Sequence, residues 1–68
     1  MFTVEDVCNE NHELEIVRIE GRESNDGQRK LYFHGVLRDV PDELKKYNVI
    51  KTAWMLGKQC HLIVIDCI

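Results

Sequence analysis

The sequence predicts a small α+β domain, in which two short helices pack on an antiparallel sheet of about four strands in the chain order α-β-β-α-β-β. Three observations support this fold class: residues typical of helix starts occur at two places, apolar and polar residues alternate between them, and glycine-containing turns divide the alternating stretches. The chain has 68 residues, of which 44% are hydrophobic and 31% charged. This length and composition indicate a single folded domain over residues 1–68 rather than a disordered chain.

Residues 1–12 are expected to form a helical segment, with an extended arm as the alternative. Thr3 is followed three residues later by Asp6, which is the spacing of a capping box at a helix start. We therefore place a short helix over residues 4–10, where the early acidic residues interact favourably with the positive end of the helix dipole.

Residues 13–39 are predicted to form a β-hairpin. Its strands, 13–22 and 29–39, are separated by a polar stretch that contains Asp26 and Gly27, a pair typical of tight hairpin turns. A period of two then assigns the side chains to two faces. One face would carry Leu14, Ile16, Leu31, Phe33 and Leu37, and the other Val17, Ile19, Tyr32, His34 and Val36.

Residues 40–48 are predicted to form a second short helix. Pro41 suits a first helical turn, where its missing N–H costs nothing. Acidic residues follow it and lysines come later, in agreement with the helix dipole. Asn48 is a residue type that commonly ends helices.

Residues 49–68 are predicted to form a C-terminal hairpin that turns near Gly57. Its second strand is apolar on both faces, which is typical of a strand covered on both sides. Two short helices can cover one face of the sheet, so we expect a second copy to cover the other, giving a homodimer. Strand-to-strand pairing of two copies along an exposed edge would also cover apolar surface. The alternative to a dimer is a sheet that curls into a half-barrel and closes on itself. The residues concerned are Leu62, Val64 and Ile68 on one face, and Ile63, Ile65 and Cys67 on the other.

Cysteine usage and hydropathy indicate where the protein works. The three cysteines, Cys8, Cys60 and Cys67, fit no disulfide framework of a small secreted domain and are expected to be reduced. No stretch is long and apolar enough to span a bilayer, and the first residues lack the pattern of a signal peptide. We therefore expect a cytoplasmic protein with no membrane partner.

Catalytic chemistry and metal binding are not predicted. Cys8, His12, Cys60 and His61 are ligand types that zinc prefers. However, adjacent strand residues such as Cys60 and His61 point to opposite faces. Cysteine–histidine catalysis would need an exposed thiolate, and the strand pattern buries the thiols. We predict no catalytic residue, no metal site and no cofactor.

The charges divide unevenly along the chain, although the net charge is only −3. Residues 1–28 contain eight carboxylates against two arginines, which gives −6, and residues 29–68 contain four against seven basic groups, which gives +3. The acidic part is either a solvated surface or a docking face for a basic protein. A carboxylate array of this kind can also mimic a nucleic-acid backbone and occupy a basic channel.

Together these features predict a non-catalytic protein-interaction module that self-associates through its C-terminal hairpin and binds another protein. Its size and plain composition suit an accessory or inhibitor protein of a phage or mobile element. The predicted protein-binding residues are Trp54, Ile63 and Ile65 at the apolar contact, with Tyr32 and His34 as further candidates. The alternative is a nucleic-acid-binding sheet on which Tyr32, His34 and Trp54 stack with bases while nearby lysines and arginines contact phosphates.

Overall fold

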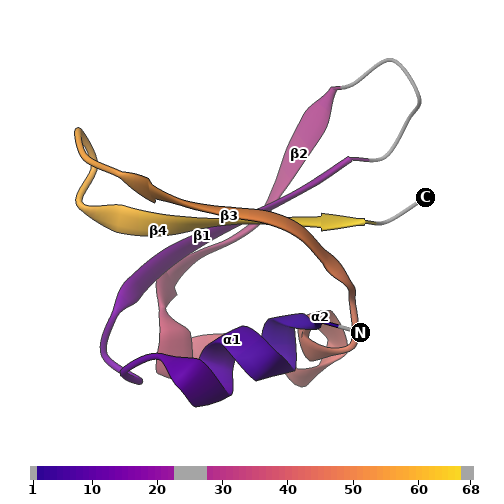
Figure 1. Ribbon diagram of the computed structural model, residues 1–68, viewed down its shortest axis with the longest axis horizontal. Coiled ribbons are helices and arrows are strands. Elements are labelled where there is room, and N and C mark those ends of the chain that lie inside the picture. Colours follow the sequence, from indigo (N-terminus) through magenta and orange to yellow (C-terminus); the bar gives the residue numbers. More distant parts are fainter. Residues whose placement is uncertain (1, 23–27, 67–68) are drawn as a thin grey trace.

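The computed structural model describes residues 2–22 and 28–66 and contains a four-stranded sheet with two helices beneath one face (Figure 1). The predicted α+β class and the order α-β-β-α-β-β are confirmed. The predicted turn at Asp26 and Gly27 lies outside the described residues, as do Cys67 and Ile68. The elements are α1 (Val4–Glu10), β1 (Ile16–Arg22), β2 (Arg29–Val36), the short 3-10 helix η1 (Leu37–Asp39), α2 (Asp42–Lys45), β3 (Val49–Met55) and β4 (Cys60–Asp66).

The sheet is mixed rather than purely antiparallel, which corrects one detail of the predicted fold. Its strand order is β2-β1-β4-β3. The pairs β1–β2 and β3–β4 are antiparallel, as the hairpin signals predicted, whereas β1 and β4 are parallel. The two hairpins therefore meet through β1 and β4, and η1 and α2 carry the chain from one hairpin to the other. As a result β4 is a central strand, and β2 and β3 are the edges.

The amino-terminal segment is a helix rather than an extended arm. The Thr3 side chain accepts a hydrogen bond from the Asp6 backbone N–H at 3.4 Å, and the Asp6 carboxylate accepts one from the Thr3 backbone N–H at 2.9 Å. These two contacts are the predicted capping box. The Val4 N–H also donates to the Tyr47 carbonyl at 3.1 Å, which fixes the start of α1 to the residues that lead into β3.

The second helical segment is shorter and more broken than predicted. The chain forms η1, passes through an extended Pro41, and then makes the single turn of α2. Pro41 has no N–H to donate and disfavours a helical residue before it, so it separates the two turns. Leu37, Val40 and Leu44 are nevertheless all buried, so both turns contribute to the core.

The core lies between the sheet and the helices. β4 contributes Ile63 and Ile65, which are both 0% exposed. They lie in register with the side chains of β1 on the same face, because Ile19 pairs with Ile63. The full cluster consists of Val4, Val7, Val17, Ile19, Leu37, Val40, Leu44, Ile63 and Ile65.

Two β-bulges change the predicted faces of the edge strands. The pairing of β1 with β2 shifts after Ile19, so that Ile19 pairs with Phe33 and Glu20 with Leu31. Tyr32 and Phe33 therefore both pack against the core, although strict alternation places them on opposite faces. A second shift lies between Val49 and Lys51 at the start of β3.

We expect the Ile63→Ala variant to lose about 2–5 kcal/mol of free energy of unfolding, because it removes a fully buried side chain between the sheet and the helices. Leu14→Ala is the control, since Leu14 is 53% exposed and its truncation should change stability by no more than about 0.5 kcal/mol. Urea denaturation followed by circular dichroism measures both values. Equal losses for the two variants would contradict the assignment of Ile63 to the core.

Candidate interaction surface

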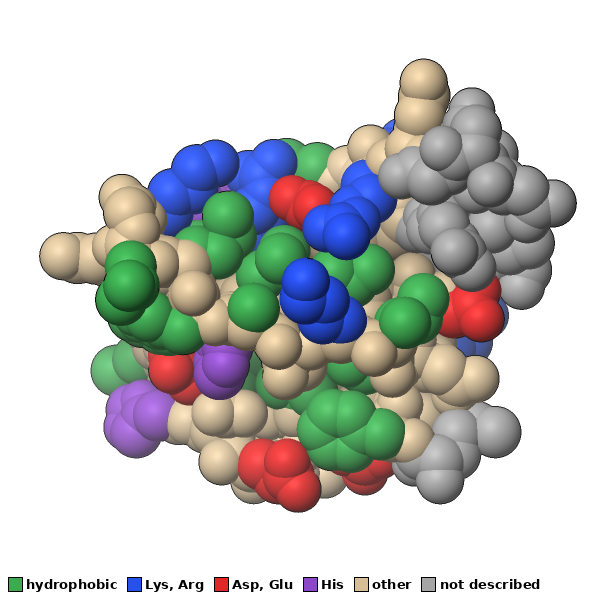
Figure 2. All heavy atoms as spheres, turned by 45° about the horizontal axis from the view of Figure 1, so that its top comes forward, with side chains coloured by type: hydrophobic (Ala, Val, Ile, Leu, Met, Phe, Trp, Pro, Cys, Tyr) green, Lys and Arg blue, Asp and Glu red, His purple; other side chains and the backbone are tan. Residues whose placement is uncertain are grey.

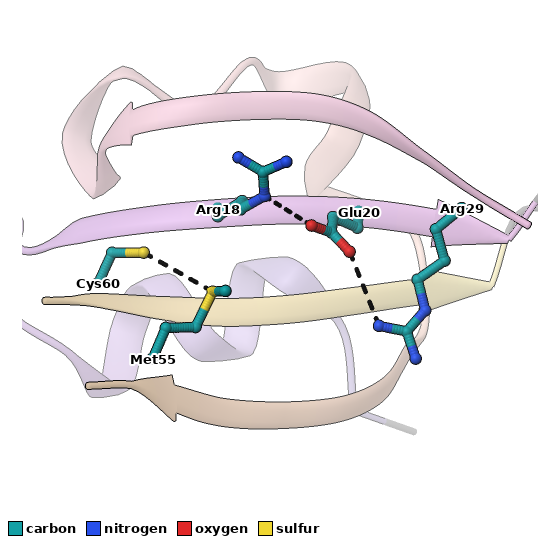
Figure 3. A network of polar contacts seen from close by, with 5 residues as sticks. All are labelled: Arg18, Glu20, Arg29, Met55 and Cys60. Atoms are coloured by element: carbon teal, nitrogen blue, oxygen red, sulfur yellow. Dashed lines mark hydrogen bonds and ion pairs between the residues drawn. The ribbon is translucent and has the colours of Figure 1, made fainter. Parts of the chain in front are cut away.

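The face of the sheet opposite the helices is called the open face here, and Figure 3 looks onto it. Cross-strand pairing identifies its side chains, because paired residues point to the same side of a sheet. One row of paired residues crosses all four strands. It consists of His34 on β2, Arg18 on β1, Leu62 on β4 and Ala53 on β3. By the same register the open face carries Ile16, Arg18, Glu20, Arg29, Leu31, His34, Val36, Lys51, Ala53, Met55, Cys60, Leu62, Val64 and Asp66.

The middle of the open face is apolar and almost fully covered, although no helix lies over it. Leu62 is 9% exposed and Val64 is 4% exposed. They pair in register with Arg18 and Glu20 of β1, whose side chains lie beside them. The aliphatic part of a long arginine side chain covers apolar surface while its charged end stays in water. The two apolar faces of β4 are therefore satisfied within one chain.

This arrangement corrects the predicted role of Ile63 and Ile65. Both were expected at an apolar contact with a partner, and both instead lie in the core between the sheet and the helices. The physical reason is the central position of β4, which no pattern within the hairpin itself can indicate. The apolar side chains at these two positions therefore belong to the core of one chain.

Charged side chains form a network over the apolar middle of the open face (Figure 3). Arg18 Nε lies 2.6 Å from Glu20 Oε2, and Arg29 Nη1 lies 3.7 Å from Glu20 Oε1. Glu20 is only 17% exposed, so solvent screens this network less than a fully exposed pair. The terminal amino groups of Arg18 point away from Glu20 and bond to no other described residue. They remain available as hydrogen-bond donors.

Charge is segregated between the two layers of the molecule. Residues 2–15 and 37–48, which form the helix layer, contain eight carboxylates against three basic groups, or −5. Residues 16–22, 28–36 and 49–66, which form the sheet layer, contain two carboxylates against six basic groups, or +4. In Figure 2, lysine and arginine side chains lie among hydrophobic ones over the sheet, and most of the acidic side chains in view lie below them.

The five predicted binding residues do not form one surface. Trp54 is 49% exposed at the edge strand β3, and its ring meets His61 edge-on with the ring centroids 5.8 Å apart. Tyr32 packs against the core from β2. His34 is exposed on the open face beside Arg18. Because Tyr32, His34 and Trp54 lie in three different places, they do not build a common platform for stacked bases.

Sequence reasoning missed the central residues of the open face. Arg18 and Glu20 are separated by two positions on β1, a spacing that places opposite charges on the same side of a strand. This signal was available. The role of Arg29 could not be predicted from the sequence, because its contact with Glu20 depends on the shifted register between β1 and β2.

Candidate chemistry at the cysteines and histidines is not assembled in the described part of the chain. Across residues 2–22 and 28–66, no three His, Cys, Asp or Glu side chains gather to hold a metal ion, and no pocket is present. The same residues contain no helix that is long and apolar enough to cross a membrane. Burial raises the pKa of the Cys8 thiol, an effect that Lys45 partly opposes and Glu5 reinforces.

The Cys8 thiol should therefore react slowly with alkylating reagents at neutral pH, because only the thiolate reacts and the raised pKa keeps its fraction small. In a Cys67→Ser variant we expect its rate to be still rising at about pH 9. Cys60 is buried and should not react in the folded protein. A Cys8 rate that is already constant above about pH 8 would contradict this environment.

We expect the Glu20→Gln variant to lose about 1–3 kcal/mol of free energy of unfolding, because it removes the carboxylate that Arg18 and Arg29 share above the apolar middle of the sheet. Asp42→Asn is the matched control. Asp42 also makes one ion pair, with Lys45 Nζ at 3.1 Å, but its side chain is 97% exposed. Its loss should cost no more than about 0.5 kcal/mol in chemical denaturation. Equal costs would show that the Glu20 network is an ordinary surface contact.

The open face thus offers apolar contact area together with oriented basic donors, a combination suited to binding a macromolecular surface rather than to catalysis. Exposed Ile16 and Leu31 extend the apolar area on β1 and β2. Comparison of the chain with models of protein families, with curated proteins and with solved structures finds no match.

Proposed function

We propose that this protein is a non-catalytic protein-interaction module whose open face binds an acidic surface of another protein. The observation that carries the proposal is a sheet face over which no helix lies. Its central apolar side chains are little exposed, and Arg18, Arg29 and Lys51 surround them. In this proposal the protein works as a small accessory or inhibitor protein of the cytoplasm, acting by complex formation.

Exposed apolar side chains favour a protein as the partner. Ile16 is 38% exposed and Leu31 is 45% exposed, and both belong to the open face. Protein interfaces combine such apolar side chains with arginine, whose planar group binds a carboxylate through two hydrogen bonds. The free donors of Arg18 are suited to a carboxylate of this kind, because the bond to Glu20 already fixes the orientation of the guanidinium.

The separation of charge between the layers determines which side meets the partner. The helix layer repels an acidic protein, whereas the sheet layer attracts it. Such long-range attraction orients the two molecules before contact and raises the association rate. It weakens as salt is added, because ions screen the charges.

Nucleic acid is the second candidate, because the charge of the sheet layer is also suited to phosphates. The positions of Tyr32, His34 and Trp54 count against this candidate, since bases have no shared aromatic surface on which to stack. A protein partner therefore accounts for more of the open face.

The test uses two defined probes: a synthetic peptide that alternates glutamate and leucine, and a mixed-sequence single-stranded oligonucleotide. Amide chemical shifts of the labelled protein report where each probe binds. We expect the peptide to shift the signals of open-face residues such as Ile16, Leu31 and Val64, and its affinity to fall as salt is raised. A stronger response to the oligonucleotide at the same residues would support nucleic-acid binding instead. Helix-layer shifts alone, or none with either probe, would refute the proposal.

Two charge variants give the matched comparison. Lys51→Gln removes one basic group from the open face without touching the Glu20 network, and we expect peptide affinity to fall about two- to fivefold. Lys46→Gln removes the same charge from the helix layer and should leave affinity within about twofold. Equal effects would indicate that the peptide responds to net charge and not to the open face.

A further inference from the structure

The edge strand β3 carries a second surface that the proposed function does not use. Ile50 is 53% exposed, Trp54 is 49% exposed, and Leu56, just after the strand, is 82% exposed. Among residues 2–22 and 28–66, no strand pairs with the outer side of β3 beyond Val49. An exposed, apolar strand edge is a template for pairing with another strand, because its outer backbone groups have no partner in the sheet.

The amino-terminal segment limits where such pairing can occur. The Val49 N–H donates to the Phe2 carbonyl at 2.8 Å, and Thr3 forms an isolated antiparallel bridge with Asn48. The outer edge is therefore occupied at the first residue of β3. The free part of β3 runs from Ile50 to Met55, and the exposed Leu56 follows it in the turn. The stretch 50–56, which holds all three exposed apolar side chains, has Ala53 as its midpoint.

We propose that a second copy of this chain occupies the free edge, with the two β3 strands antiparallel about a two-fold axis at Ala53. This register places Ile50 opposite Leu56 of the second copy, and Thr52 opposite its Trp54. Residues that pair across an antiparallel ladder point to the same face, so their positions must differ by an even number. This condition is met when the two-fold axis passes through a residue, and it is not met when the axis passes between two residues. Ala53 is the residue that centres the pairing on the free stretch.

The stretch is self-complementary in this register, which favours a second copy over another protein. Its three exposed apolar side chains all gain contacts, and the two Trp54 rings lie on a diagonal of about 7–8 Å, within reach of aromatic side chains. Its single charge, Lys51, stands opposite Met55 of the second copy, so no like charges meet. The contact is isologous and uses up both β3 edges, so that it closes at a dimer.

The dimer would have a defined shape. A two-fold axis perpendicular to the sheet keeps both helix layers on one side and joins the two open faces into one face of eight strands. The basic surface would double in extent, which increases avidity for a partner that carries two acidic segments. The pairing itself does not rest on the proposed binding of an acidic protein.

The decisive experiment changes the residue on the axis to either sign of charge. In Ala53→Lys and in Ala53→Glu, each introduced charge meets its own copy, and we expect the dissociation constant of the dimer to rise at least about tenfold in both. Mixing the two variants should restore a dimer that contains one chain of each, identified by its mass in native mass spectrometry of reduced protein. An axis at position 53 predicts this rescue, because the lysine of one chain then faces the glutamate of the other.

Leu31→Lys and Leu31→Glu are the controls, because Leu31 is 45% exposed on the opposite edge strand β2. Each should remain dimeric alone, with no preference for mixed dimers. Trp54, the single tryptophan of the chain, gives a second measurement in the unmodified protein. Its emission should shift to shorter wavelength as concentration rises and the ring becomes covered.

A monomeric mass with constant Trp54 emission up to about 1 mM protein would overturn the proposal. Dimers of the Ala53 variants that are as stable as the unmodified dimer would overturn it as well, since they would place the contact elsewhere. Peptide binding at the open face can succeed or fail in either case, because it is measured through Ile16, Leu31 and Val64. Failure of the dimer is thereby distinguished from failure of the proposed function.

Discussion

The parallel pairing of β1 with β4 is the constraint on which the rest of the structure depends. It joins two hairpins that would otherwise be separate, and an isolated two-stranded hairpin is marginally stable at best. Through this pairing Ile19 of β1 and Ile63 of β4 meet on the face of the sheet that the helices cover. The same pairing makes β4 a central strand, so that both of its apolar faces are buried within one chain.

The open face shows how a small sheet covers its second side without another layer. Leu62 and Val64 are nearly buried on this face, and they lie in register with the charged residues Arg18 and Glu20 of β1. The aliphatic parts of such side chains can shield apolar residues from water, while their charged ends stay at the surface and can contact a partner. Residues with both roles are sensitive positions, because a substitution chosen to weaken binding can also uncover the apolar middle.

The two proposed surfaces are different in kind and lie on different parts of the sheet. The open face offers side chains, with an apolar middle and fixed basic donors, whereas the edge of β3 offers backbone groups with apolar side chains beside them. A two-fold axis through the edge would leave the open face uncovered and extend it. Self-association and partner binding are therefore compatible in one molecule, with the acidic helix layers turned away from the partner.

The sequence by itself determined the local structure of this protein. Thr3 and Asp6 set the start of α1, and the alternation of apolar residues indicated four strands, because these signals act over a few residues. Pro41 was expected in the first turn of one helix and instead separates η1 from α2. Only the tertiary structure decided the order of the strands and the two shifts in register. These features determine the positions of several residues that the sequence did not indicate. Ile63 and Ile65, predicted at an interface, lie in the core, and Arg18, Glu20 and Arg29 lie together on the open face. Pairing between strands distant in sequence depends on contacts across the whole domain, and no local pattern in β4 distinguishes burial in a core from burial against a partner.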